Sequence, residues 1–255
     1  MTTKPDHLLI DGDIIAYQAA SAVEVPTDWG GGLWTLHSDL NAAIDKAVSS
    51  IQSMWESSGA TSVALYFTEG DNWRKTVLPT YKSNRKKTRK PLVLAPLREF
   101  LRSVYTCHST PGMEADDLLG ATLTCPHVTG TDAAIVSIDK DLGQIPGLHW
   151  SEARGTYLVT WQEGDYLHML QTLTGDTTDG YSGCPGVGPV KAQKILGAVG
   201  EKTLKEMWDA VVATFVKAGL PPEEALVQAR VAKIAQWENI DQKTGMAIPW
   251  TPPTI

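Results

Sequence analysis

The sequence has few cysteines, no paired histidines and no long hydrophobic run, and each of these absences excludes a class of protein. The three cysteines are widely spaced and include no C-x-x-C pair, so they indicate neither a disulfide framework nor a zinc site. The six histidines are scattered singly, without the H-x-x-x-H spacing of a metal-binding pair. There is no run of about 18 apolar residues and no signal-peptide pattern. We therefore expect a soluble, cytoplasmic protein with no membrane partner.

The net charge and its distribution point in opposite directions. A formal charge of −7 argues against a nucleic-acid partner, because a polyanion repels an acidic protein. However, the stretch from Arg74 to Arg102 holds ten of the 22 basic residues and a single acid, Glu99. An isolated basic run is more often a solvated loop. This run lies between acidic clusters, so we interpret it as an electrostatic footprint for phosphate.

Nine carboxylates fall into four short clusters. The clusters are Asp11 with Asp13, Glu114 with Asp116 and Asp117, Asp139 with Asp141, and Asp176 with Asp179. Carboxylate oxygens suit Mg²⁺ and Mn²⁺, and a pair of such ions is a standard device for hydrolysing phosphodiesters. If the fold brings the clusters together, they form an acidic pocket that only cations could neutralise. The clusters therefore predict a metal-dependent nuclease.

Short apolar runs typical of buried parallel strands alternate with helical patterns. The expected strands are 7–11, 61–68, 133–139 and 156–161, and the expected helices between them are 39–56 and 114–123. This order predicts an α/β sheet covered by helices. Asp11 and Asp139 then lie at the carboxyl ends of strands, where open α/β sheets bind their ligands.

Local geometry suggests how the carboxylates converge. Residues i and i+2 of an extended chain face the same side, so Asp139 and Asp141 are expected to aim at one point, and Asp11 and Asp13 likewise. The three acids at 114–117 share the first turn of a helix. The alternative for that turn is a set of acids that only complements the helix dipole.

From residue 162 onward the sequence is helical. The expected helices are 164–172, 189–196, 203–217 and 222–237, and a proline-rich extended tail follows them. Between the first two helices, Gly186 and Gly188 leave backbone N–H groups free to approach a phosphate, with Lys191 close by. This turn predicts a clamp on the nucleic-acid backbone that does not depend on base sequence.

With these motifs in order, the chain resembles the 5′-nuclease family, which includes flap endonucleases, the 5′-nuclease domain of bacterial DNA polymerases and small bacteriophage 5′–3′ exonucleases. The resemblance runs from about Leu8 to Leu196. Its motifs are I-D-G at 10–12, G-M-E-A-D-D-L at 112–118, S-I-D-K-D-L-G-Q at 137–144, the glycine-rich segment 175–192, and Y-K-S-N-R at 81–85.

The resemblance implies a PIN-like, Rossmann-like, mostly parallel sheet flanked by helices. It divides the chain into a nuclease core, 1–161, with a basic arch segment at about 74–112, and a helical DNA-binding region, 162–255, with a helix-three-turn-helix at about 163–197. It also implies two divalent ions, Mg²⁺ or Mn²⁺, and adds a monovalent cation at the helix-three-turn-helix as a candidate.

Roles for single residues follow from the resemblance alone. Asp11, Glu114 and Asp116 would hold the first ion; Asp139, Asp141 and Asp179 would hold the second; Asp117 and Asp176 would bridge through water or directly. From the Tyr81 motif, Lys82 and Arg85 would steady the scissile phosphate. Tyr17 would stack on the terminal base, although a core tyrosine on a helix face is nearly as good an interpretation.

One position departs from the family pattern. The family has an aspartate at the end of the second strand, where this chain reads F-T-E-G-D at 67–71. Either Glu69 or Asp71 substitutes for it, or the ligand is missing at Thr68. Asp13 is a further weak candidate for the site. In the arch segment, Pro91 and Pro96 are expected to interrupt helix formation.

The main hypothesis is a 5′–3′ DNA exonuclease that uses two metals, one to generate hydroxide and one to stabilise the leaving 3′-oxygen, and that releases 5′-phosphates. Its substrates would be duplex DNA with 5′ ends, nicks or flaps, and RNA–DNA hybrid in primer removal. A monomer in the cytoplasm of an infected bacterium is expected if the source is viral. The alternatives are a structure-specific flap endonuclease, a non-catalytic DNA-binding module, and an RNA-cleaving relative, which the glycine-rich turn disfavours.

Overall fold

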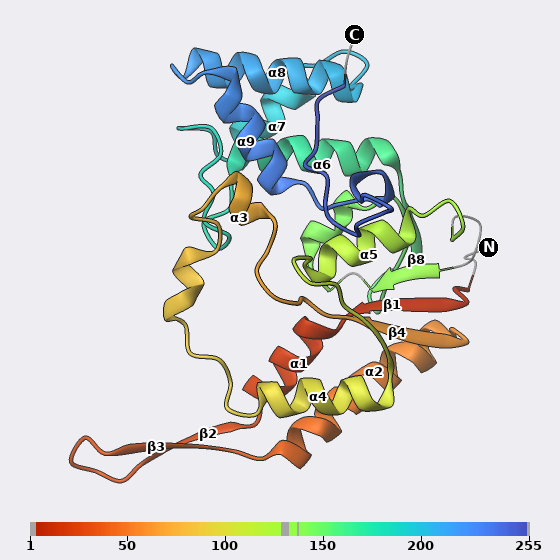
Figure 1. The fold of residues 1–255 in the computed structure, drawn as a ribbon, viewed down its shortest axis with the longest axis vertical. Coiled ribbons are helices and arrows are strands. Elements are labelled where there is room, and N and C mark those ends of the chain that lie inside the picture. Colours follow the sequence, from red (N-terminus) through yellow and green to blue (C-terminus); the bar gives the residue numbers. More distant parts are fainter. Residues whose placement is uncertain (1–3, 129–132, 137, 254–255) are drawn as a thin grey trace.

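A mostly parallel sheet lies at the centre of the N-terminal part of the chain in a computed structural model, which describes residues 4–128, 133–136 and 138–253 (Figure 1). Within these residues the sheet has six strands in the order β5-β4-β1-β6-β7-β8. Their bounds are β1 His7–Asp11, β4 Ser62–Tyr66, β5 Thr106–His108, β6 Ala133–Val136, β7 Gly147–Ser151 and β8 Gly155–Val159. All neighbours pair in parallel except β7 and β8, which form an antiparallel edge. The predicted α/β fold with a mostly parallel sheet is therefore confirmed.

Both faces of the sheet are covered, because alternate side chains of each strand enter different cores. Leu8 and Ile10 pack with the helices α1 (Gly12–Ser21), α2 (Leu40–Ser58) and α4 (Leu94–Val104). Leu9, between them, packs on the opposite face against α5 (Ala115–Leu123). The strand ends near Asp11 are thus fixed from two sides.

The helix expected at 39–56 forms because its ends carry strong signals. Asp39 accepts hydrogen bonds from the backbone N–H groups of Asn41 and Ala42, and Gly59 closes α2 in the left-handed region, with φ of 68°. A β-hairpin that the sequence pattern did not predict precedes it, formed by β2 (Glu24–Asp28) and β3 (Trp34–Ser38). It projects from the body at the lower left of Figure 1.

The basic segment from Arg74 to Arg102 runs from α3 (Arg74–Val77) through a 3-10 helix at Ser83–Lys87 into α4. The expectation that Pro96 interrupts helix formation is wrong. Pro96 lies in the first turn of α4, where its missing N–H has no partner within the helix in any case. Pro91 precedes the helix, so only this proline acts as a boundary.

The C-terminal helices α6 (Trp161–Thr174), α7 (Pro189–Gly197), α8 (Leu204–Lys217) and α9 (Pro222–Ala232) enclose a core of their own. The tail returns to this core, where Trp250 packs edge-on against His168 and Trp208. In the described part of the chain, no helix is both long and apolar enough to cross a bilayer.

The helix expected at 222–237 ends early, at Ala232, and the chain then runs extended from Lys233 to Gln236. The core replaces the helical hydrogen bonds that are lost. Gln144 Oε1 accepts from the Ile234 N–H, and Asp117 Oδ1 accepts from the Ala235 N–H. This extended segment, the C-terminal strap (residues 233–236), lies across α5.

Candidate active site

A pocket at the carboxyl ends of β1, β4 and β6 collects eight of the nine clustered carboxylates. Its acidic lining is Asp11, Asp13, Glu114, Asp116, Asp139, Asp141, Asp176 and Asp179, and its basic lining is Lys75, Lys82, Arg85, Lys90, Arg98 and Lys140. Tyr17, about half exposed on α1, lines the same pocket with Tyr81. Ser137, the first residue of the third motif, lies outside the described residues.

Asp11 is the last residue of β1 and also the N-cap of α1. Its Oδ1 accepts from the backbone N–H groups of Asp13 at 2.8 Å and Ile14 at 3.1 Å. The expectation of an extended Asp11–Asp13 pair is therefore wrong, because Asp13 already lies in the first helical turn. Burial, then the Asp13 and Asp139 carboxylates, raise the pKa of Asp11 to about 7.

The acids of α5 have different environments. Glu114, at the N-cap, accepts from Arg74 Nη1 and the Tyr81 hydroxyl, each at 3.0 Å, and pairs with Lys82. Burial acts to raise the pKa of Glu114, but Arg74 and Lys82 outweigh it and hold that pKa below its ordinary value. In the described structure Asp116 forms no ion pair, and its buried Oδ1 has no hydrogen-bond partner. Burial, then Asp11 and Glu114, raise the pKa of Asp116 well above its ordinary value.

Asp117 is the one clustered acid that the fold does not bring to the pocket. Its Oδ1 accepts from Arg74 Nη2 at 2.7 Å and the Ala235 N–H at 2.9 Å, and its Oδ2 accepts from Arg74 Nη1 at 2.8 Å and Trp73 Nε1 at 2.9 Å. Both oxygens are thus already satisfied inside the protein. The structure gives Asp117 a part in the core instead of the bridging role that the resemblance implies.

Asp139 and Asp141 reach the pocket by a turn. Asp139 caps the 3-10 helix Lys140–Gln144 by accepting from the Asp141 N–H at 2.9 Å, so the two are not on an extended chain as expected. Asp141 Oδ1 accepts from Gln171 Nε2 of α6 at 2.7 Å. Burial, then the Asp139 charge, raise the pKa of Asp141 to about 6.

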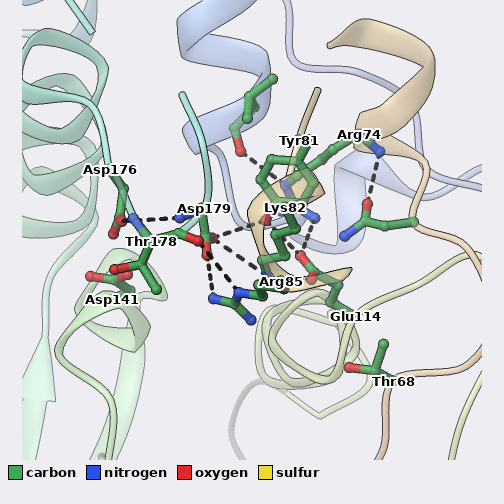
Figure 2. Close-up of polar contacts among 12 residues, drawn as sticks. Thr68, Arg74, Tyr81, Lys82, Arg85, Glu114, Asp141, Asp176, Thr178 and Asp179 are labelled. Atoms are coloured by element: carbon green, nitrogen blue, oxygen red, sulfur yellow. Dashed lines mark hydrogen bonds and ion pairs between the residues drawn. The ribbon is translucent and has the colours of Figure 1, made fainter. Parts of the chain in front are cut away.

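Asp176 and Asp179 lie in the turn after α6 and meet the basic segment (Figure 2). Asp176 Oδ1 accepts from the N–H groups of Thr178 and Asp179, which fixes the turn. Asp179 pairs with Arg85 and lies 3.5 Å from Lys82 Nζ. The Lys82 N–H also donates to the Asp179 carbonyl at 2.8 Å.

Lys82 and Arg85 alter the electrostatics that the acidic clusters predict. They lie between Asp179 and Glu114 in Figure 2, so protein cations already neutralise part of the pocket. Across the described ranges, no three acidic, histidine or cysteine side chains form a ready metal-binding group. Lys82 has φ of 52° and ψ of 21°, a left-handed conformation that non-glycine residues seldom adopt.

The remaining predicted residues lie away from this pocket. Gly186 and Gly188 are exposed in the turn before α7, and Lys191 Nζ donates to the Gly186 carbonyl at 3.2 Å. Glu69 accepts from the Ser109 hydroxyl, and Asp71 pairs with Lys75; neither acid lines the pocket.

Sequence reasoning missed Arg74 and Arg98, which hold carboxylates of the site. Arg74 is buried against Glu114 and Asp117, and Arg98 pairs with Asp13 at 3.0 Å. Both were counted within the basic run as charges for phosphate. Nothing in the local sequence separates a buried arginine from its exposed neighbours in such a run.

Comparisons with known proteins agree with this architecture. A family model described as 5′-3′ exonuclease, N-terminal resolvase-like domain, matches residues 6–160. The exodeoxyribonuclease of Enterobacteria phage T3 is 30% identical over 96% of this chain and 92% of its own length. The exonuclease of Escherichia phage T7 is 29% identical over 91% of this chain and 89% of its own.

Among solved structures, the T5 D15 protein crystallised with metal ions has a similar fold, with a TM-score of 0.57 and 16% identity over 89% of this chain and 92% of that one. A mostly parallel sheet with carboxylates and basic side chains at its strand ends, together with these relatives, defines a nuclease. More particularly, the chain belongs to the 5′–3′ exonuclease family.

Proposed function

We propose that this nuclease is a divalent-metal-dependent 5′–3′ exodeoxyribonuclease that releases 5′-phosphates. The observation that carries the proposal is one pocket that combines eight carboxylates with Lys82 and Arg85 at the ends of three strands. The names of the T3 and T7 relatives support DNA as the substrate. Structures of the T5 D15 protein with metal ions, and with DNA and metal ions, support a pocket for both.

The donor set fits Mg²⁺ or Mn²⁺. Burial and neighbouring acids raise the pKa values of Asp11, Asp116 and Asp141, and Asp116 Oδ1 has no hydrogen-bond partner among the described residues. A cation bound beside these carboxyls would favour their ionised form. Hard oxygen donors are what these ions prefer. Asp11, Glu114 and Asp116 would hold one ion, and Asp139, Asp141, Asp176 and Asp179 the other. Bound there, the ions would activate water and stabilise the leaving 3′-oxygen.

Lys82 and Arg85 would exchange partners during binding. Without DNA they neutralise Glu114 and Asp179. A scissile phosphate entering the pocket brings its own negative charge, and the carboxylates become available to metal ions as the two cations turn to the phosphate. There they would stabilise the charge that develops on the phosphoryl group. Tyr81 OH, 3.0 Å from both Glu114 and Asp179, keeps these carboxylates together during the exchange.

The helical region, residues 162–255, would bind the duplex. The turn between α6 and α7 contains Gly186 and Gly188, and Lys191 lies exposed on the first turn of α7. We assign the backbone clamp of a helix-three-turn-helix to this turn. Tyr17, about half exposed in the lining of the pocket, would stack on the terminal base. The phage relatives support a role in the cytoplasm of an infected bacterium. We propose that the chain acts there as a monomer.

The proposal is tested by cleavage of end-labelled DNA with Mg²⁺ and with a chelator. We expect Asp139→Asn to abolish Mg²⁺-dependent cleavage and to retain DNA binding, measured by fluorescence anisotropy in Ca²⁺. Asp209→Asn is the control, because Asp209 is an exposed acid paired with Lys205 on α8. Cleavage by Asp139→Asn at the parent rate would exclude this metal site.

Product lengths separate exonuclease from flap endonuclease. Blunt duplex, nicked duplex, 5′-flap DNA and RNA–DNA hybrid should be compared, each labelled at either end. Mononucleotides from blunt and nicked ends support the proposal, and release of a single intact flap supports the endonuclease. Hybrid cleavage at a similar rate would support primer removal.

A further inference from the structure

The second strand of the sheet ends without the acid that the family pattern has there. Thr68 follows β4, and the structure rules out the two nearby acids as substitutes. The Glu69 carboxylate is turned to the Ser109 hydroxyl at 2.6 Å. Asp71 pairs with Lys75, its side chain is 89% exposed, and it does not line the pocket.

A different acid occupies the end of β4. Asp13 Oδ2 accepts from the Thr68 N–H at 2.7 Å, although the two residues are 55 positions apart. Asp13 lines the pocket with Asp11 and Asp116. Thr68 Oγ1 in turn accepts from the N–H of Ala115, the residue before Asp116, at 3.1 Å. Two hydrogen bonds therefore connect Asp13, through Thr68, to the helix turn that carries Asp116.

A second contact fixes the Asp13 carboxylate from the other side. Arg98 Nη2 lies 3.0 Å from Asp13 Oδ1 and also donates to the Thr68 carbonyl at 2.8 Å. The simplest alternative is that this ion pair only joins α1 to α4. Those helices already pack through a buried core that includes Ile15 and Leu97, so the ion pair is not needed to hold them together.

The electrostatics also favour a role in the pocket. Asp13 lies in the first turn of α1, directly after the N-cap Asp11, and both carboxylates line the same pocket with Asp116. Several carboxylate charges gathered in one pocket attract a cation to it. Asp13 is therefore a further carboxylate of the same set.

We propose that Asp13 stands in for the absent second-strand aspartate and contributes to binding the divalent ion held by Asp11 and Asp116. The inference rests on the metal-dependent function proposed above. The carboxylate that is absent at Thr68 is then supplied by the first turn of α1, and not by Glu69 or Asp71, the acids next to Thr68 in the sequence. The first turn of α1 and the end of β4 are joined by the hydrogen bond from the Thr68 N–H to Asp13.

The test measures Mn²⁺ binding without DNA, by electron paramagnetic resonance and calorimetry, so that cleavage is not the readout. Asp13→Asn keeps an acceptor for the Thr68 N–H and removes the charge; we expect about 10- to 100-fold weaker Mn²⁺ binding. The double variant Asp13→Asn with Thr68→Asp returns the charge to the strand end and should restore affinity. Glu69→Gln and Asp71→Asn are matched controls and should bind as the parent does.

The effect of Arg98→Met on Mn²⁺ affinity distinguishes a metal-binding Asp13 from one that only joins α1 to α4. If Asp13 serves only the ion pair, Asp13→Asn and Arg98→Met should lower the melting temperature alike and leave Mn²⁺ affinity unchanged, which would overturn the inference. If Asp13 binds the ion, Arg98→Met removes a competing cation and should strengthen Mn²⁺ binding. Should Asp13→Asn fold poorly, Arg98→Met alone still decides between the two, because it leaves Asp13 in place: stronger Mn²⁺ binding supports the inference and unchanged binding overturns it.

Failure of this inference is separable from failure of the proposed function. Asp11→Asn and Asp116→Asn are expected to abolish Mn²⁺ binding at the site. If they do so and Asp13→Asn binds like the parent, only the role of Asp13 is wrong. If all three bind like the parent, the proposed metal site itself is wrong.

Discussion

Arg74 and Asp117 form a two-point ion pair in the interior, with Nη2–Oδ1 and Nη1–Oδ2 distances of 2.7 and 2.8 Å and almost no exposure. The pair connects separate parts of the chain. Arg74 also donates to Glu114 at 3.0 Å and to the carbonyls of Val231 and Lys233. It thus joins the end of α9 and the C-terminal strap to a carboxylate of the active site.

Asp117→Asn should lower stability and leave metal binding nearly unchanged. Removing the Asp117 charge leaves the buried Arg74 with Glu114 as its remaining carboxylate, and breaking a buried pair costs up to about 3–5 kcal/mol. The measurement is urea unfolding in a chelator, with the exposed Asp209→Asn as the control, for which almost no change is expected. A variant as stable as the parent that loses Mn²⁺ binding would instead make Asp117 a ligand.

Lys82→Ala should weaken cleavage and strengthen metal binding, which is an unusual combination of signs. The Lys82 ammonium neutralises Glu114 in the free protein, so its removal leaves a stronger site for a cation. The same removal takes a cation from the phosphoryl group, and the cleavage rate should fall about 10²- to 10³-fold. Single-turnover cleavage and Mn²⁺ titration check the two effects, and Lys205→Ala on α8 should change neither.

Much of the fold could be predicted, because local and global signals agree. Residues 8–10 and 133–136 are apolar throughout, since both faces of the sheet are covered, and α2 carries a cap at each end. The same agreement put Asp11 and Asp139 at strand ends, and both line the pocket.

The rest depends on contacts between distant segments. Asp117 and Asp116 are adjacent in the same helical turn, yet one faces Arg74 in the core and the other faces the pocket. The end of α9 at Ala232 is set by side chains of Gln144 and Asp117 that no local pattern around residue 233 contains. The helical sequence pattern continues to residue 237 and contains no sign of these distant side chains, so it could not predict that the helix ends at Ala232.

Stability without metal should fall as the pH rises from about 4 to about 7, relative to Asp11→Asn. The folded-state pKa of Asp11 is about 7, above its ordinary 3.8, so in this window the folded protein holds a proton that the unfolded chain has lost. Because only the folded state holds this proton, the free energy of unfolding falls as the pH rises, by at most about 4 kcal/mol for this shift in pKa. Glu114 and Asp117, whose shifts have the opposite sign, are common to both proteins and cancel in the difference. The Asp11 charge also raises the pKa of Asp116, so Asp116 adds to the difference in the same direction.

The measurement is the free energy of unfolding in a chelator across pH 4 to 8 for the parent and Asp11→Asn. As the pH rises, the free energy of unfolding of Asp11→Asn should increase relative to that of the parent. Mg²⁺ should stabilise the parent more at pH 8 than at pH 5. A difference that does not change with pH would mean that Asp11 ionises normally in the fold.

Gly120→Ala should destabilise the protein and reduce cleavage together, because it displaces the C-terminal strap. A Cβ at Gly120 would lie 2.2 Å from the Ala235 carbonyl oxygen and 3.4 Å from its carbon, and both are backbone atoms. The strap cannot move away freely, since the Ala235 N–H is bonded to Asp117. Overpacking of this kind costs about 1–3 kcal/mol.

Gly197→Ala is the matched control, because Gly197 ends α7 with open space around it, and Ala there should be neutral or stabilising. The strain at Gly120 reaches the pocket through Asp117, Arg74 and Glu114, so cleavage at saturating Mg²⁺ should fall for Gly120→Ala and stay constant for Gly197→Ala. If Gly120→Ala unfolds at the urea concentration of the parent, the strap is not fixed to α5, and the connection from α9 to the active site must run through Arg74 alone.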